Sequence, residues 1–228
     1  MKKRSLLFLL LALLMSSLTG FAQKRVAFVY QSSYNPNRYV WGASGYDPTL
    51  DPIHKALVAK YQLTDFVYAS TATPDLTTLE TYDLVVLSEA ISGASTLGNA
   101  LVGLVGQVPV LNFKAYHYNS GRWGWATPAN PTVKTSSVTI NSGFESHPIF
   151  KGVTVTNNSV QIFDSTNVSS NLVQGFSSVV ATSPIETDQI IANVTGTTTY
   201  AIHEITKLAH KYMLIPLSSD LITTVTEN

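Results

Sequence analysis

Three short apolar runs, separated by stretches that carry helix signals, constrain the fold of this chain more than any other feature. The runs are Arg25–Tyr30 (RVAFVY), Asp83–Ser88 (DLVVLS) and Val108–Phe113 (VPVLNF). Nearly continuous apolar runs of this length are typical of parallel strands that are covered on both faces. Parallel strands need long crossover connections, which usually contain a helix. We therefore expect a layered α/β architecture.

The connecting stretches contain the expected helix signals. Asp47-Pro48 and Asp51-Pro52 each place an Asp before a Pro, the order found at helix starts, and the apolar stripe that follows predicts a helix to about Tyr61. A further strand is predicted over Leu63–Tyr68, and a glycine-weakened helix over Ser95–Val105. With right-handed crossovers, this alternation predicts a doubly wound, flavodoxin-like, mostly parallel sheet in the order 2-1-3-4.

The pattern changes after residue 131, where short β-rich pieces follow without a strongly amphipathic helix between them. The predicted strands are Ser136–Ile140, Val160–Phe163, Leu172–Val173, Val179–Ala181, Gln189–Val194, Thr199–Ile205 and Lys211–Leu217. We expect them to extend the sheet or to form an antiparallel extension on it. Ser218–Leu221 predicts a helix start, yet the chain stops eight residues after Asp220. We therefore expect a module truncated before a final helix, and whether the natural chain continues past Asn228 is left open.

The first 22 residues predict a signal peptide. A basic start at Lys2, Lys3 and Arg4 precedes an apolar stretch over Leu6–Met15, and small residues precede a cleavage site after Ala22. The apolar stretch is shorter than the roughly 20 residues of a membrane-spanning helix. We therefore expect export to the periplasm or the extracellular space without a stable membrane anchor, and a single domain over residues 23–228.

Composition excludes several function classes. Without the predicted signal peptide the chain keeps 11 basic and 14 acidic residues, a net charge of −3, and only 12% of all residues are charged. That balance argues against a nucleic-acid partner, which requires a basic surface. The chain has no cysteine. Disulfides, thiolate catalysis and cysteine-ligated metals are therefore excluded, and a hydrophobic core must supply the stability.

Two long loops, Gln31–Asp47 and Lys114–Pro131, hold all three tryptophans and follow predicted strands. Parallel strands would bring the loops to the same edge of the sheet, where open α/β sheets bind ligands. Aromatic faces together with polar side chains suit a carbohydrate or another small polar ligand. The alternative is that the indoles anchor a long loop onto the sheet. The candidate ligand contacts are Arg38, Tyr39, Trp41, Tyr116, His117, Arg122, Trp123 and Trp125.

Four residues are candidates for acid, base or nucleophilic chemistry. Ser88 lacks the flanking glycines of a nucleophile elbow, so we expect it to end its strand. Glu89, at the same edge, suits an acid, a base or a hydroxyl acceptor. His117 lies within the second aromatic loop and is expected to contact ligand. His203 is a candidate base, but alternation along its strand sends it and Glu204 to opposite faces, so the two are not expected to act as a pair.

Metal and nucleotide sites are not indicated. The five histidines show neither HxH nor HExxH spacing, and there is no acidic cluster of the DxDxDG type. No GxGxxG or GxxxxGK[ST] motif is present. We therefore expect no metal and no cofactor, although ligands from distant loops stay possible in principle.

The segment His147–Val153 (HPIFKGV) resembles the HP-I-x-x-G-[LIV] turn of trehalose-utilisation (ThuA-like) proteins. These belong to the class I glutamine amidotransferase-like superfamily, whose layout the order of strands and helices also resembles. Amidotransferases of that superfamily use a cysteine nucleophile and a His-x-Glu pair. This chain has no cysteine, and His203-Glu204 lacks the intervening residue. The resemblance therefore implies the fold without glutaminase activity.

Three functions are compatible with these features. The first is an exported domain that binds carbohydrate, with Glu89 as a hydroxyl acceptor beside the aromatic loops. The second is a ThuA-like hydrolase or sugar-modifying enzyme that uses Glu89 with His117 or His203. The third is a non-catalytic interaction module whose aromatic loops dock neighbouring domains of a longer surface protein.

Overall fold

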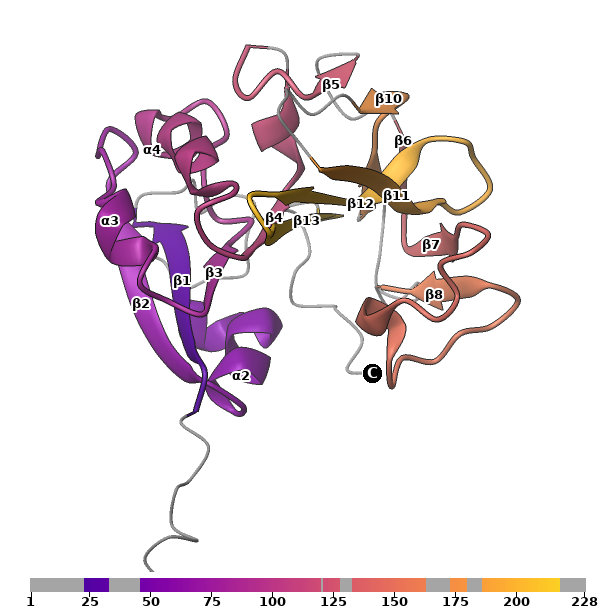
Figure 1. Cartoon of the computed structure of the whole chain (residues 1–228), viewed down its shortest axis with the longest axis horizontal. Helices are drawn as coiled ribbons and strands as arrows, with labels where there is room; N and C mark the ends of the chain where they lie inside the picture. Colours follow the sequence, from indigo (N-terminus) through magenta and orange to yellow (C-terminus); the bar gives the residue numbers. More distant parts are fainter. Residues whose placement is uncertain are drawn as a thin grey trace, which may run out of the picture.

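The first four strands of the computed structural model form a parallel sheet in the predicted order, β2-β1-β3-β4 (Figure 1). Their bounds are β1 Arg25–Gln31, β2 Gln62–Tyr68, β3 Leu84–Leu87 and β4 Val110–Lys114. The structure describes residues 23–32, 46–119, 121–127, 133–162, 173–179 and 186–217. The flavodoxin-like α/β class predicted from the sequence is confirmed.

Helices cover both faces of this parallel sheet. Successive residues of β1 alternate between the two cores, Val26 and Phe28 in one, Ala27 and Val29 in the other. Helix α2 (Pro52–Val58) packs Ile53 and Leu57 on the first core. Helices α3 (Leu76–Leu79) and α4 (Thr96–Ala100) bury leucines in the second, together with the 3₁₀ helix η3 (Leu101–Leu104). Double-sided burial explains why β1 and β3 are apolar without alternation.

Each of the two Asp-Pro pairs begins a helix, where the sequence predicted one start at either of them. The carboxylate of Asp47 accepts a hydrogen bond from Thr49 N at 2.9 Å and begins the 3₁₀ helix η2 (Pro48–Leu50). The carboxylate of Asp51 accepts one from Ile53 N at 2.8 Å and begins α2. Helix α2 ends before the predicted Tyr61, and the helix predicted over Ser95–Val105 divides into α4 and η3. Tightening of a last turn to 3₁₀ geometry is common where a helix ends.

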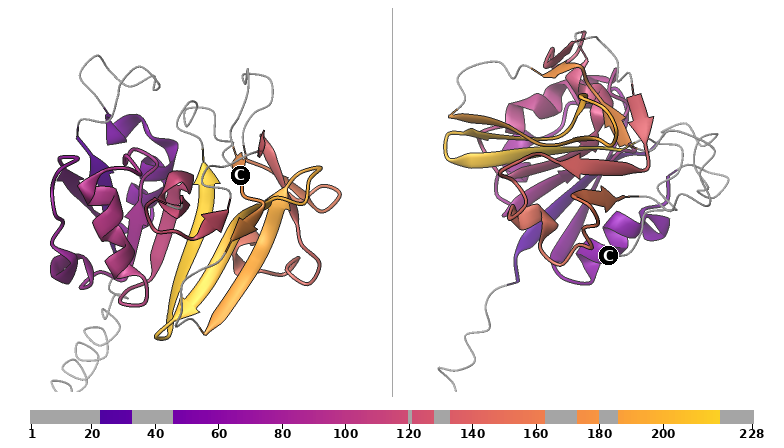
Figure 2. Two further views of the ribbon diagram at one scale, coloured as in Figure 1. Left: turned by 90° about the horizontal axis from the view of Figure 1, so that it is seen from above. Right: turned by 90° about the vertical axis from the view of Figure 1, so that its right-hand side faces the viewer.

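The β-rich half continues the same sheet. Strand β13 (His210–Leu217) pairs in parallel with β4, and the order then runs β12, β11, β7, β8 with antiparallel pairing (Figure 2). The predicted extension is therefore partly parallel and partly antiparallel. The remaining elements are β5 Ala126–Thr127, β6 Val133–Thr135, β7 Ser137–Ile140, β8 Ser159–Gln161, β9 Val173–Gly175, β10 Ser178–Val179, β11 Thr187–Val194, β12 Tyr200–Lys207, η4 Ala115–Tyr118 and η5 Pro148–Phe150.

Some sequence predictions fall on other parts of the chain. The predicted signal peptide over residues 1–22 and the predicted helix start at Ser218 lie outside the described residues. Within the described ranges, no helix has both the length and the apolar character needed to cross a bilayer.

Candidate functional site

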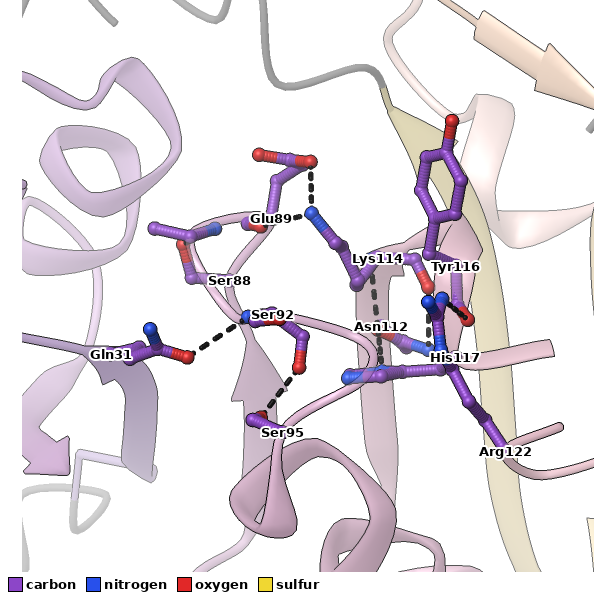
Figure 3. Close-up of polar contacts among 11 residues, drawn as sticks. Gln31, Ser88, Glu89, Ser92, Ser95, Asn112, Lys114, Tyr116, His117 and Arg122 are labelled. Carbon is purple, nitrogen blue, oxygen red and sulfur yellow. Dashed lines mark hydrogen bonds and ion pairs between the residues drawn. The ribbon is translucent and has the colours of Figure 1, made fainter. Parts of the chain in front are cut away.

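Polar side chains gather at the carboxyl ends of β1, β3 and β4 (Figure 3). Gln31 ends β1, and its side-chain oxygen accepts a hydrogen bond from Ser92 N at 3.1 Å. Gln31 N also donates to Ala90 O at 2.9 Å, so the segment after β3 is held against β1. This is the switch point of a 2-1-3-4 sheet, where neighbouring crossovers leave in opposite directions and ligands commonly bind.

A buried ion pair joins the ends of β3 and β4. Lys114 Nζ lies 2.6 Å from Glu89 Oε1, and the two side chains are 3% and 1% exposed. The same ammonium donates to the backbone oxygen of Glu89 at 3.1 Å. Removing two charges from water is costly even when they are paired, and an apolar pair would often serve stability as well. A buried pair at this edge is therefore a reasonable marker of function.

Tyr116 and Arg122 lie beside the ion pair. The Tyr116 ring centroid is 5.7 Å from Lys114 Nζ and 5.7 Å from Arg122 Cζ. Arg122 Nη1 donates to Tyr116 O at 2.8 Å. A Cβ at Gly93 would lie 2.9 Å from Tyr116 Cβ and 2.8 Å from Arg122 Nη1, so glycine is needed there for close approach. Tyr116 and Arg122, both predicted to contact ligand, are half-buried. They lie beside the ion pair of Glu89, the residue predicted to act as an acid, a base or a hydroxyl acceptor.

His117 is fully buried directly below this group. Its Nδ1 lies 3.3 Å from Asn112 Oδ1, and its ring stacks on Trp123 with centroids 4.7 Å apart. Its Nε2 has no hydrogen-bond partner in the described part of the chain. Burial, followed by the charges of Lys114 and Arg122, holds the pKa of His117 well below its usual value of 6.5. His117 is therefore neutral near pH 7.

The predicted base His203 lies apart from the ion pair. Its Nδ1 is 2.7 Å from Tyr118 Oη and its Nε2 is 2.6 Å from Asp188 Oδ1. Glu204 points to the other face, as alternation predicted, and bonds Lys211 at 2.8 Å. Among the described contacts, Glu89 therefore pairs with neither His117 nor His203. His203 has the bonding of a structural histidine.

Both described tryptophans lie in the core instead of at a solvent-facing rim. Trp123 and Trp125 are 7% and 4% exposed, and their ring centroids are 5.2 Å apart. Trp123 Nε1 donates to Gly98 O at 2.9 Å, and both rings contact Tyr118 and Tyr212. The indoles bury large apolar areas and so anchor the loop, the alternative that the sequence left open; their contact with a ligand stays a prediction.

The candidate contacts of the first aromatic loop, Arg38, Tyr39 and Trp41, lie outside the described residues. That they lie close to the second aromatic loop therefore stays a prediction.

Ser88 ends its strand as expected. Its Oγ accepts a hydrogen bond from Ala90 N at 3.0 Å and lies 3.4 Å from Tyr46 Oη. Neither Ser88 nor Glu89 has a positive φ, so the strained turn of a nucleophile elbow is missing here. Tyr46 in turn donates to Asp51 Oδ2 at 2.6 Å, and burial raises the pKa of Asp51.

Sequence reasoning missed two members of the site, Lys114 and Asn112. The sequence does mark both positions, because a polar residue within or directly after an otherwise apolar strand needs a buried hydrogen-bond or charge partner. Asn112 interrupts VPVLNF and Lys114 follows it directly. In the described ranges no three His, Cys, Asp or Glu side chains are grouped so that they could hold a metal ion.

The turn that carried the family resemblance lies elsewhere in the fold. His147 caps η5, its Nδ1 accepting from Ile149 N at 3.4 Å, and its Nε2 lies 3.4 Å from Glu204 Oε2. Gly152 has a φ of +81°, which favours glycine. These contacts give the turn a structural role.

Comparison with known proteins identifies the fold and no finer class. No family model and no curated protein sequence matches the chain. The cytoplasmic protein STM1381 from Salmonella typhimurium LT2 superposes with a TM-score of 0.51 at 13% identity, over 85% of this chain and 87% of that one. This similarity supports the α/β fold.

Two further solved structures are more distant. A ThuA-like protein from Bacteroides uniformis ATCC 8492 has a TM-score of 0.49 at 9% identity, over 88% of this chain and 86% of its own. The exo-β-1,4-mannosidase Op5Man5 from Opitutaceae bacterium strain TAV5 has a TM-score of 0.49 at 10% identity, over 93% of this chain and 34% of its own.

Proposed function

We propose that this chain is an exported, ThuA-like carbohydrate-binding domain without glutaminase activity, and that its binding site is the carboxyl edge around Glu89 and Lys114. The observation that carries the proposal is the buried Glu89–Lys114 pair, 2.6 Å apart, beside the half-buried Tyr116 and Arg122. The export part rests on the N-terminal sequence, and the glutaminase part on the missing cysteine.

The chemistry of these side chains suits a polyhydroxylated ligand. A carboxylate accepts hydrogen bonds from sugar hydroxyls, and ammonium and guanidinium groups donate to hydroxyl oxygens. A tyrosine ring offers an apolar face for the C–H face of a pyranose. Glu89, Lys114, Arg122 and Tyr116 supply all three kinds of group within one small region. A flat apolar docking surface would not need a buried ion pair.

The test is calorimetric titration of the protein with a panel of neutral and uronate-containing oligosaccharides. Tyr116→Ala should weaken binding about tenfold, which corresponds to about 1.4 kcal/mol. Tyr61→Ala is the control for loss of a tyrosine ring, because the exposed Tyr61 precedes β2 at the opposite, amino edge of the sheet. A panel without a binder would refute the proposal, as would equal effects of the two substitutions.

A sugar-modifying enzyme is the second candidate, and the state of His117 favours it. A neutral imidazole with an unbonded Nε2 is the form that a general base requires. Because His117 is fully buried, a substrate would reach it only after the residues that cover it move. The binding function therefore comes first. Release of reducing ends from the same oligosaccharides, abolished by His117→Gln, would establish the enzyme, and no release at any pH would reject it.

A further inference from the structure

Buried hydrogen bonds surround both candidate histidines. One group joins Asp188, His203 and Tyr118, and the other joins Tyr212, Asn112 and His117. The rings of Tyr118 and Tyr212 stack with their centroids 6.2 Å apart. All of these side chains except Asp188 are less than 2% exposed. Each buried hydrogen needs both a donor and an acceptor, so fixed donors and acceptors set the direction of the bonds beside them.

Backbone geometry sets the direction at Asn112 (Figure 3). Lys114 N is a donor and lies 2.9 Å from Asn112 Oδ1, which must therefore be the carbonyl oxygen. The other amide atom, Nδ2, then donates to Tyr212 Oη at 2.8 Å. The Tyr212 hydroxyl is the acceptor of this bond, and its ring stacks on that of Tyr118 with centroids 6.2 Å apart.

The carboxylate of Asp188 fixes one hydrogen of His203. An ionised carboxylate only accepts hydrogen bonds, so His203 Nε2, at 2.6 Å, carries a hydrogen. His203 Nδ1 lies 2.7 Å from Tyr118 Oη, so both ring nitrogens have a partner.

His117 carries its hydrogen on Nδ1. Asn112 Oδ1 is an acceptor 3.3 Å from His117 Nδ1, so the hydrogen of the neutral ring is on Nδ1. Nε2 is then a bare lone pair, and it has no partner in the described structure. Stacking on Trp123, whose indole is bonded to Gly98 O, holds the plane of the ring. A Cβ at Gly98 would lie 3.2 Å from Nε2, so glycine keeps that nitrogen uncrowded.

We propose that Asn112, held by Lys114 N and the Tyr212 hydroxyl, is the positioning residue of His117 and fixes its bare Nε2 as a hydrogen-bond acceptor for a ligand hydroxyl. The role toward a ligand rests on the proposed function of this edge. Tyr212 acts through Asn112 and need not touch a ligand.

The first experiment measures the tautomers directly. Long-range ¹H–¹⁵N spectra of the full chain labelled at histidine separate protonated from unprotonated ring nitrogens, with His117→Gln and His203→Gln to assign the signals. At pH 7 we expect His117 protonated on Nδ1 only, and a hydrogen on His203 Nε2, which faces Asp188. A hydrogen on His117 Nε2, or none on His203 Nε2, would overturn the proposal. The unsubstituted protein decides this result, whether or not any variant folds.

The second experiment tests the control that Asn112 exerts. Asn112→Asp keeps the shape but places a carboxylate beside His117 Nδ1, where the positive neighbours are Lys114 and Arg122. The pH at which His117 takes up its second proton should rise by at least one unit, about 1.4 kcal/mol. The ring signals of His54, which is bonded to Asp65 and packs on Phe28 of the other core, should be the same in both proteins. An unchanged His117 would refute the positioning role.

These outcomes separate the inference from the proposed function. If His117 has the predicted tautomer but no oligosaccharide binds, the positioning of His117 by Asn112 is kept and the saccharide site is rejected. If an oligosaccharide binds but His117 has the other tautomer, the saccharide site is kept and the positioning role is rejected.

Discussion

Two buried polar regions lie on β4 and its neighbours, and they differ in how completely they are satisfied. Around His203, both ring nitrogens and both tyrosine hydroxyls have partners. At the carboxyl edge, an ion pair is buried and His117 Nε2 has no partner among the described residues. Satisfied networks make a core specific and rigid, whereas costly or incomplete ones need another reason to persist. That contrast is why we place function at the edge and structure around His203.

Breaking the ion pair should have the largest effect. Lys114→Met leaves the Glu89 carboxylate buried without its ammonium, and the free energy of unfolding should fall by about 3–5 kcal/mol. Urea unfolding measures it. Glu89→Leu together with Lys114→Met should recover most of the loss. Lys24→Met is the matched control, since the Lys24–Asp83 pair is exposed and little change is expected there. A loss no larger than that of the control would remove the contrast between the regions.

Removing one hydrogen-bond partner from the region around His203 should lower the free energy of unfolding by less than breaking the ion pair. Tyr118→Phe removes the hydroxyl that pairs with His203 Nδ1, and a buried polar group left without a partner costs about 1–3 kcal/mol. Thermal and urea unfolding both report the change. Tyr61→Phe, at an exposed position, controls for loss of a hydroxyl and should be neutral. If Tyr118→Phe were equally neutral, the His203 region would not be the structural one.

The pH dependence of stability tests the neutral state of His117. Its pKa in the folded protein is lowered, so below the ordinary value of 6.5 the unfolded chain binds a proton that the folded chain does not. Stability from this group is complete above that pH. It falls by about 1.4 kcal/mol per pH unit as the pH decreases toward the folded pKa. His117→Gln should reduce the dependence of the unfolding free energy on pH between pH 7 and pH 5. An unchanged dependence would contradict the neutral state of His117 in the folded protein.

The smallest effect concerns the turn between β12 and β13. Leu208 and Ala209 have φ values of 50° and 64°, as in a type I′ turn, which favours Asn-Gly. Replacing them by Asn-Gly should raise the unfolding free energy by about 1 kcal/mol. Oligosaccharide binding should not change, because the turn lies at the opposite end of β13 from Leu217, the partner of Lys114. Altered binding would show that the extension takes part in the site.

Features that depend on residues close together in the sequence could be predicted, whereas features that depend on contacts between distant residues could not. Continuous apolar runs and Asp-Pro starts are local signals, so the four parallel strands and the start of α2 were predicted within a few residues. The burial of Trp123 was not decided by local pattern, since loop indoles serve equally as anchors or as contacts. Its position depends on Gly98 O and Tyr212, which are far away in the sequence.

The amino-acid sequence by itself determined the α/β class, the strand order and the exclusion of thiol chemistry, because burial on two faces and the absence of cysteine are properties of composition and spacing. Only the tertiary structure decided that Glu89 pairs with Lys114, 25 residues away, and that His117 and His203 have different surroundings. Hydrogen bonds and ion pairs between distant segments depend on how strands are set side by side. Each strand reveals which side chains need partners, and only the assembled sheet brings those partners within reach.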